Sequence, residues 1–386
     1  MASPSGSGPL SGIKVIELAG IGPAPFCCML LADMGAQVIR VDRTIPGDVG
    51  VPSNPRYQLL NRGRRSIAID LKQAAGVDII KKLIENADIF VEGFRPGVAE
   101  RMGLAPDACL AINPQLVYGR MTGWGQDGPL AQAAGHDINY ISLTGVLDSI
   151  GTRNGPPVAP MNLVGDFGGG ALYLAFGIAC ALNESQKSGI GQVVDASIVD
   201  GSAHLMTSVF GMMARNDWSR ERGRNLVAGG KPWYGVYKTL DQQYISIGAV
   251  EERFYQELLE RTGLNQEFDG RRDDPASWPL MAQRLETIIG SRTRDEWTQL
   301  LEGSDTCFAP VLNVDEAQSH PHIKARKVFI ESHGVVQPAP APRFSRTPTK
   351  LDLPPPSPGQ HTRDILLEWG YTKQQIEMYF KNKIIA

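Results

Sequence analysis

Residues 12–42, GIKVIELAGIGPAPFCCMLLADMGAQVIRVD, contain the order of elements that decides the fold. A short β-branched apolar run (13–18) precedes a Gly/Pro-rich turn, an apolar run of helical character (26–34) and a second β-branched run (38–41). Short apolar runs bounded by glycines are typical of buried strands. The stretch therefore predicts a strand–helix–strand unit whose two strands run parallel in one sheet.

Later segments extend this pattern along the first half of the chain. Residues 66–71, 88–91 and 116–120 resemble further strands, and the amphipathic run 75–87 resembles a helix. Residues 193–210 fit a strand followed by a helix. Because strands that alternate with helices indicate a parallel sheet, we predict an α/β fold with a Rossmann-like sheet.

The first turn does not fit a nicotinamide dinucleotide. Residues 20–25 read GIGPAP, and Pro25 stands where the G-x-G-x-x-G fingerprint has its third glycine. Prolines have no backbone N–H with which to bind a pyrophosphate. The sequence thus predicts a Rossmann-like topology without nicotinamide binding.

The composition changes in the second half of the chain. Residues 214–230 are charged and glycine-rich, as expected of a linker. Two strand-like runs (234–240 and 243–249) and several helical runs follow, which predicts a second, smaller α+β domain. The proline-rich residues 335–359 predict an extended segment that wraps over a surface, before a last helix at 362–369.

Bulk composition excludes several functional classes. The 386 residues are 42% hydrophobic and 20% charged, with a formal net charge of −3, so no basic field for nucleic acid or anionic membranes is expected. The five cysteines lack metal-ligand spacing, which predicts reduced thiols and no metal site. Residues 1–8 do not resemble a signal peptide, and no apolar run reaches about 18 residues. We therefore expect a cytoplasmic protein without a membrane span.

Two candidate proton-transfer groups lie in residues 135–170. The segment opens with GHDINY, which contains His136, and closes with NLVGDFGGG, which contains Asp166. Both lie beside glycines, which allow a ligand to approach the backbone. A helix-like run (171–183) follows Asp166, and a helix N-terminus attracts negative charge. Two bases beside an anion-stabilising surface suggest chemistry at a carbon acid.

Each of these residues also has a structural interpretation. A lone histidine is more often structural, and Asp166 can simply cap the helix that follows it. Three glycines, however, weaken a first helical turn by about 1 kcal/mol each, which a cap alone does not require. Glu251 ends a predicted strand, where it is either a helix cap or a site residue.

Arginines near predicted strands suggest a ligand that carries phosphate. Arg62, Arg64 and Arg65 cluster beside one strand. Arg43 and Arg95 follow two others. Parallel sheets bind ligands at the carboxyl ends of their strands, and arginine binds phosphate through paired hydrogen bonds. The alternative is that these arginines are ordinary solvated surface residues.

With these motifs the chain resembles the class III coenzyme A transferase superfamily, and within it the α-methylacyl-CoA racemases. The resemblance covers almost the whole chain, from GIKVIEL (12–18) and LADMGA (31–36) to GAVE (248–251) and PAPRF (340–344). The strings GHDINY and NLVGDFGGG carry most of its specificity.

The resemblance implies a large Rossmann-like domain built from residues 1–213 and a C-terminal segment, 326–386, that returns to it. A linker (214–229) and a small α+β domain (230–325) would lie between them. The resemblance also implies an interlocked homodimer, whose active sites lie between the large domain of one chain and the small domain of the other.

In such racemases the matching histidine and aspartate are the two bases, which assigns these roles to His136 and Asp166. Glu251 would orient the histidine from the partner's small domain. The implied contacts to the substrate and its coenzyme A moiety are Arg43, Ile69, Asp70, Leu71, Lys72, Gly135, Asp137, Ile138, Asn139 and Tyr140. Lys231 departs from the family, which has a small residue there, and the bulky Trp233 is expected near the acyl channel.

The implied activity is the interconversion of (2R)- and (2S)-2-methylacyl-CoA thioesters in fatty acid metabolism, by 1,1-proton transfer through an enolate. No cofactor is expected, because coenzyme A is part of the substrate. Inversion needs one base on each face, and N–H groups near Asp137 or after Asp166 would stabilise the enolate oxygen. Two alternatives stay open: a CoA-transferase that moves CoA between carboxylic acids through an Asp166 anhydride, and a CoA-binding protein without catalysis.

Overall fold

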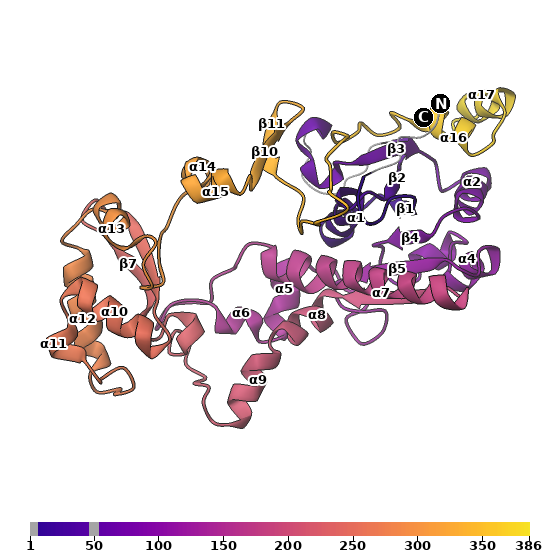
Figure 1. Ribbon diagram of the computed structural model, residues 1–386. Coiled ribbons are helices and arrows are strands. Elements are labelled where there is room, and N and C mark those ends of the chain that lie inside the picture. The colour runs from indigo at the N-terminus through magenta and orange to yellow at the C-terminus, as the bar shows by residue number, and fades with distance from the viewer. Residues whose placement is uncertain (1–6, 46–53) are drawn as a thin grey trace. The chain divides into compact units, whose positions relative to one another are not determined.

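The computed structural model describes residues 7–45 and 54–386, so most of the segment tested for a signal peptide, residues 1–6, lies outside it. The chain divides into two compact units (Figure 1). Unit 1 comprises Met1–Thr144, Met161–Met206 and Lys327–Ala386, and unit 2 comprises Gly145–Pro160 and Thr207–Arg326. The domain boundaries inferred from the resemblance stay a prediction.

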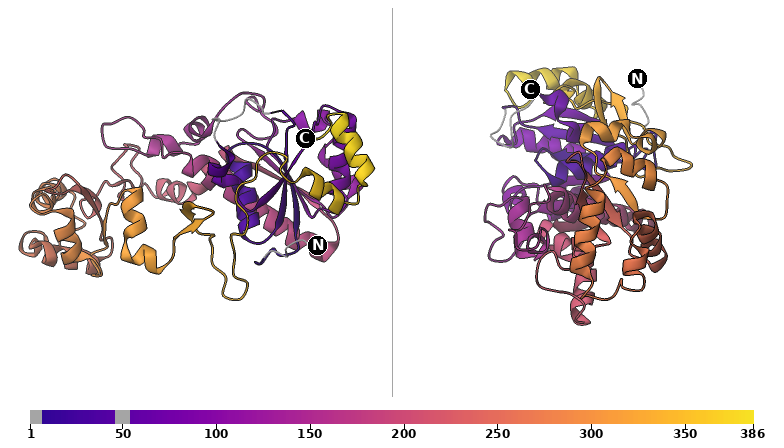
Figure 2. Two further views of the ribbon diagram at one scale, coloured as in Figure 1. Left: turned by 90° about the horizontal axis from the view of Figure 1, so that it is seen from above. Right: turned by 90° about the vertical axis from the view of Figure 1, so that its left-hand side faces the viewer.

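A six-stranded parallel sheet forms the centre of unit 1 (Figure 2). Its strands are β1 (Lys14–Leu18), β2 (Gln37–Asp42), β3 (Arg64–Ala68), β4 (Ile89–Glu92), β5 (Val117–Thr122) and β6 (Gln192–Ser197). They lie in the order β3-β2-β1-β4-β5-β6, and every neighbouring pair is parallel. The predicted α/β fold with a Rossmann-like sheet is therefore confirmed. The strand order reverses between β1 and β4, where such sheets bind ligands.

Alternate residues of each strand face two separate hydrophobic cores, because side chains of a strand point to opposite faces in turn. Ile16 and Leu18 of β1 belong to one core, and Val15 belongs to the other. The first core packs under α2 (Ala74–Ile84), α4 (Pro106–Ile112), α16 (Thr362–Glu368) and α17 (Lys373–Lys381). The second core packs under α1 (Pro23–Asp33) and α7 (Leu172–Ser188). Burial on both faces explains the nearly continuous apolar runs of the strands.

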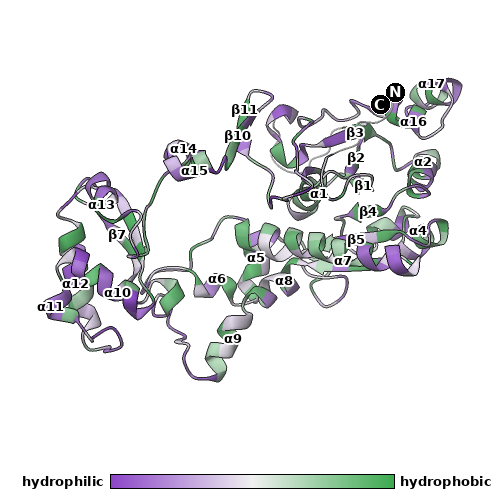
Figure 3. Ribbon diagram, viewed as in Figure 1, coloured by the Kyte–Doolittle hydropathy of each residue, from purple (hydrophilic) through white to green (hydrophobic). Residues whose placement is uncertain are grey.

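The helical run Leu163–Ser188 is the segment of the described chain that is long and apolar enough to cross a membrane. Hydrophobic residues occur along much of α7 (Figure 3). A single such helix is weak evidence for a span, because the core helix of a folded domain meets the same criteria. The remaining helices of unit 1 are α3 (Val98–Arg101), α5 (Asp137–Leu143), the π-helix η3 (Leu163–Ala171), α8 (Ile198–Leu205) and two 3-10 turns, η1 (Pro55–Tyr57) and η2 (Leu59–Asn61).

The C-terminal part of unit 1 begins with an antiparallel hairpin, β10 (Phe329–Ser332) and β11 (Val335–Pro338). Residues 339–361 then contain neither helix nor strand, in keeping with the predicted extended segment. The chain ends beside the sheet, where Ile385 bridges to Ile69 and the Asp70 N–H donates to the Ile384 carbonyl over 2.8 Å. This hairpin and α17 were not predicted from the sequence.

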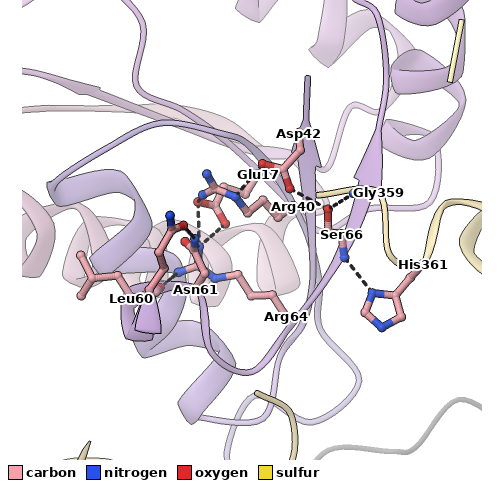
Figure 4. A network of polar contacts seen from close by, with 10 residues as sticks. Glu17, Arg40, Asp42, Leu60, Asn61, Arg64, Ser66, Gly359 and His361 are labelled. Atoms are coloured by element: carbon pink, nitrogen blue, oxygen red, sulfur yellow. Dashed lines mark hydrogen bonds and ion pairs between the residues drawn. The ribbon is translucent and has the colours of Figure 1, made fainter. Parts of the chain in front are cut away.

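A buried ionic network joins the C-terminal segment to the sheet (Figure 4). The Glu17 carboxylate accepts hydrogen bonds from Arg64 at 2.7 Å and from Arg40 at 3.2 Å. Ser66 donates to Asp42 and accepts from the Gly359 N–H, at 2.6 and 2.8 Å. The network therefore connects three strands to the returning segment through ion pairs and hydrogen bonds, although the buried Nε of Arg64 has no hydrogen-bond partner.

The predicted role of the arginine cluster in phosphate binding is wrong for its three members. Arg64 and Arg62 are buried against Glu17 and Asp33, and Arg65 pairs with Glu368. All three lie at or before the amino end of β3, the opposite edge from the carboxyl ends of the strands. The spacing in the sequence could not show that carboxylates from distant parts of the chain pair with these guanidinium groups.

Unit 2 has its own sheet, in the order β7-β8-β9, and its own hydrophobic core. The strands are β7 (Tyr234–Lys238), β8 (Tyr244–Gly248) and β9 (Phe308–Pro310), and all pairs are antiparallel. The helices are α6 (Val146–Ser149), α9 (Thr207–Ala214), η4 (Leu226–Ala228), α10 (Glu252–Thr262), α11 (Asn265–Phe268), α12 (Trp278–Ile289), α13 (Arg294–Leu301), α14 (Val314–Ser319) and α15 (Pro321–Ala325).

Lys231 and Trp233, which the resemblance singled out, both lie in unit 2. Trp233 is only 4% exposed and packs edge-on against Tyr255 and Trp278. The Lys231 ammonium lies 3.4 Å from the centre of the Trp278 ring, a cation–π contact. Trp233 is therefore a core residue of unit 2, and Lys231 covers the edge of that core.

Candidate active site

A cavity of about 630 Å³ lies at the carboxyl ends of β1, β4 and β5 in unit 1. Its wall includes residues 21–24 before α1, residues 93–96 after β4 and residues 121–124 at the end of β5. His136 and Asp166 both line it. The two candidate bases, which are far apart in the sequence, thus share one cavity.

His136 directly precedes α5, and its side chain is exposed. The Asn139 side chain accepts a hydrogen bond of 3.0 Å from the His136 backbone N–H. The Tyr140 hydroxyl donates to the Gly135 carbonyl, and the Tyr140 ring packs edge-on against Trp124 with centroids 4.7 Å apart. The peptide group between Gly135 and His136 is therefore held at both its N–H and its carbonyl by side chains of the same short helix.

Asp166 lies inside a π-helical turn, η3, that continues into α7. Its interpretation as a helix cap is therefore wrong, because the helix begins three residues earlier. The Phe167 N–H donates to the Asn162 carbonyl over 3.2 Å, the spacing of a π-helix. The backbone N–H groups after Asp166 are thus not the free groups of a helix start. Such π-helical turns occur frequently at functional sites.

The glycines after Asp166 allow α8 to approach this turn closely. A methyl group on Gly169 would lie 2.5 Å from the Ser202 Oγ, and one on Gly201 would lie 1.8 Å from the Gly169 carbonyl oxygen. The packing partner is a helix of the protein itself.

The surroundings of Asp166 favour a carboxyl group that holds its proton more tightly than usual. Burial raises the pKa of Asp166, and the charge of Asp137 raises it further. The Asn162 amide donates to its Oδ2 over 3.3 Å and acts in the opposite direction, as does His136. A carboxylate with a raised pKa is a stronger base, which suits proton abstraction from carbon.

Asn162 was not recognised from the sequence, although it lies four residues before Asp166 and so on the same side of a helix. Gly22 was also not recognised. Its backbone has φ +68°, and a methyl group there would lie 3.1 Å from the Asp166 Oδ2. Gly22 therefore leaves the space beside the carboxylate open.

A second cavity of about 400 Å³ lies at the carboxyl ends of β1 and β2 and beyond the end of β3. The predicted coenzyme A contacts Arg43, Ile69, Asp70, Leu71 and Lys72 all line it. Phe94 lines both cavities, so the two adjoin along one edge of the sheet. Arg95, which the sequence also singled out, lines the first cavity.

The remaining predicted residues have other positions. Gly135 and Tyr140 line the first cavity, whereas Ile138 and Asn139 line neither. Asp137 is buried and lines neither cavity, and its carboxylate accepts a hydrogen bond of 2.7 Å from the Asp166 N–H. Glu251 is an exposed residue of unit 2 at the N-terminus of α10, and its action on a histidine of another chain stays a prediction.

Within residues 7–45 and 54–386, no group of three or more His, Cys, Asp or Glu side chains is placed to hold a metal ion.

Comparisons with known proteins extend over nearly the whole chain. The family model for CoA-transferase family III matches residues 10–362. The alpha-methylacyl-CoA racemase of Mus musculus is 41% identical over 381 residues, and that of Homo sapiens is 40% identical over 383. Each match covers 97% of both chains. The crystal structure of a CAIB/BAIF family protein from Brucella suis, 26% identical, superposes with a TM-score of 0.78 and covers 94% of this chain and all of that one.

Proposed function

Since the chain belongs to CoA-transferase family III, we propose that it is an enzyme that interconverts (2R)- and (2S)-2-methylacyl-CoA thioesters. Two relatives of nearly equal length carry the name alpha-methylacyl-CoA racemase. The observation that carries the proposal is the presence of His136 and Asp166 in one cavity, because inversion at carbon needs two acid–base groups.

The reaction proceeds by 1,1-proton transfer. One base takes the proton from C2, and the electron pair of the C–H bond moves onto the thioester oxygen to give a planar enolate. The other base returns a proton to the opposite face. The Asp137 N–H, at the start of α5, is suited to stabilise the enolate oxygen, because the first N–H groups of a helix have no intrahelical acceptor.

The adjoining cavity suits the coenzyme A moiety of the substrate. Arg43 and Lys72 place two cationic side chains along its wall, and such groups bind phosphate through charge-assisted hydrogen bonds. Phe94 lies between this cavity and the bases. A thioester can then extend from the cations to the acid–base pair, and the reaction uses no separate cofactor.

The active enzyme is proposed to be an interlocked homodimer in the cytoplasm. Large apolar side chains on η3, α7 and α8 of unit 1 are exposed in the single chain: Leu163, Leu172, Phe176 and Leu205. Exposed apolar clusters of this kind mark protein–protein interfaces. In such a dimer Glu251 of the partner subunit would orient His136.

A CoA-transferase reaction is the second candidate, because the family itself is named for that activity. The Asp166 carboxylate would attack the thioester carbonyl, expel the CoA thiolate and form a mixed anhydride. That route needs an acceptor acid and does not exchange the C2 proton.

The deciding experiment incubates one epimer of a 2-methylacyl-CoA in D₂O without any acceptor acid. Racemisation predicts deuterium at C2 in both epimers, with loss of inversion in Asp166→Asn and His136→Ala. A lack of C2 exchange, together with CoA transfer to an added carboxylate and a borohydride-sensitive acyl group on Asp166, would establish the transferase instead.

A further inference from the structure

The side chain of Asp137 joins the two candidate bases, although the proposed reaction uses only its backbone N–H. The residue follows His136 directly and is 9% exposed. Its Oδ1 accepts a hydrogen bond of 2.7 Å from the Asp166 N–H, and the Gly165 N–H bonds to the same carboxylate. One buried carboxylate thus connects the backbone after one base to the backbone of the other.

The contact requires a glycine at position 165. A methyl group on Gly165 would lie 2.2 Å from the Asp137 Oδ1 and 3.0 Å from the Ile141 Cγ2. No side chain other than hydrogen can occupy this space without moving the carboxylate or α5. The acidic residue after His136 and the glycine before Asp166 therefore form one contact together.

The covalent connection between the bases does not fix their spacing within unit 1. The hydrogen-bonded residues Asp137 and Asp166 are 29 positions apart, and the intervening residues 145–160 belong to unit 2. Non-covalent contacts between α5 and η3 must therefore hold the two bases in register. The hydrogen bonds to Asp137 provide such contacts, because Asp137 follows one base directly and the donors are the N–H groups of Asp166, the other base, and of Gly165 beside it.

We propose that the Asp137 carboxylate is a positioning residue that fixes the spacing of His136 and Asp166 on opposite faces of C2. The inference rests on the proposed racemisation. With the spacing fixed, a proton leaves one face and a proton enters the other. With the Asp166 backbone released, the base that took the proton more often returns a solvent deuteron to the same face, which gives exchange with retention.

The test compares deuterium exchange with inversion and exchange with retention, starting from one epimer in D₂O. In Asp137→Asn the new side chain has the size of the aspartate, but its amide NH₂ cannot accept a hydrogen bond. One of the two backbone N–H groups, of Gly165 or Asp166, therefore loses its acceptor. We expect a fall in kcat of about tenfold to a hundredfold, as for loss of a hydrogen bond to a charged group, with KM unchanged. The ratio of retention to inversion should rise.

Asp88→Asn is the matched control. The Asp88 Oδ2 accepts the Lys14 N–H over 2.8 Å, a carboxylate-to-backbone bond between residues 74 positions apart. It lies in the same unit, at the amino ends of β1 and β4 and away from the cavity. This variant should keep the wild-type kcat and the wild-type ratio of retention to inversion.

Asp137→Glu separates charge from spacing. The polar groups that shift the pKa of Asp166 are Asn162, Asp137 and His136. Tyr140 also faces Asp166, whose charge raises the pKa of the Tyr140 hydroxyl. Removal of the Asp137 charge lowers the pKa of Asp166, so Asp137→Asn should move the acid limb of the kcat profile to lower pH. Asp137→Glu keeps the charge and displaces it, so the acid limb should stay while retention increases.

The outcomes separate this inference from the proposed function. If the wild-type enzyme does not exchange the C2 proton, the proposed function fails. The positioning role is overturned if the wild type exchanges the C2 proton but Asp137→Glu does not differ from it. In that case Asp137→Glu would show the kcat and the ratio of retention to inversion that the wild type and Asp88→Asn show. Circular dichroism and thermal unfolding identify an Asp137→Asn protein that does not fold, in which case Asp137→Glu decides alone.

Discussion

Replacement of Arg64 by methionine tests whether the buried ionic network holds unit 1 together. The guanidinium is fully buried, donates to Glu17 at 2.7 and 2.9 Å, and donates to the Pro25 and Leu60 carbonyls. Methionine fills much of the space but leaves the Glu17 carboxylate with Arg40 as its remaining cation. Removal of one partner of a buried ion pair costs about 3–5 kcal/mol, which is the expected loss in the free energy of unfolding of unit 1.

Urea unfolding at several pH values is the assay. Burial is the largest influence on the pKa of Glu17 and raises it above 4.5, and loss of the Arg64 charge raises it further. A carboxyl whose pKa is higher in the folded state destabilises the fold above its unfolded pKa. The deficit of Arg64→Met should therefore be small below about pH 4.5 and grow as the pH rises through the folded pKa of Glu17.

The double variant Arg64→Met/Glu17→Gln is the control, because it removes the charge together with its partner. It should recover most of the lost stability, since replacement of a whole buried pair is often nearly neutral. A loss below about 1 kcal/mol for Arg64→Met alone, or an equal loss in the double variant, would refute the reasoning.

Three further changes test the site itself. Gly22→Ala should lower kcat, because the new methyl group lies 3.1 Å from the Asp166 Oδ2. It should also lower the free energy of unfolding by about 1–3 kcal/mol through backbone strain. The control is Gly263→Ala, which has φ +72° and open space around the methyl group and should keep the wild-type kcat. An unchanged kcat in both would contradict the placement of Gly22. Asn162→Ala removes a hydrogen bond that lowers the pKa of Asp166, so the acid limb of the kcat profile should move to higher pH. Arg43→Ala should raise KM for the thioester about tenfold with kcat retained, and a fall in kcat alone would exclude a role in coenzyme A binding.

Several features of the site were predicted from short stretches of sequence. The strings around His136 and Asp166 identified the family, and the match to CoA-transferase family III over residues 10–362 confirms that resemblance. The structure brings both residues to one cavity and places the predicted residues 69–72 in the wall of the adjoining cavity. Motifs of this kind are recognisable because neighbouring residues act together on one ligand.

The roles of the arginines could not be predicted in this way. Arg43 lines a cavity, whereas Arg64, which also adjoins a strand, is buried against Glu17 from another strand 47 positions away. The same residue type beside the same kind of element therefore has two different roles. Its partner decides the role, and the partner is a neighbour only in the folded chain.

Local sequence patterns by themselves determined the parallel α/β sheet and the order of most of its strands and helices, because apolar periodicity and glycine positions act over a few residues. Tertiary contacts alone decided that Asp166 lies within a π-helical turn and that Asp137 reaches it. Those two facts depend on how closely α5 and α8 approach η3, and close packing is a property of the assembled core.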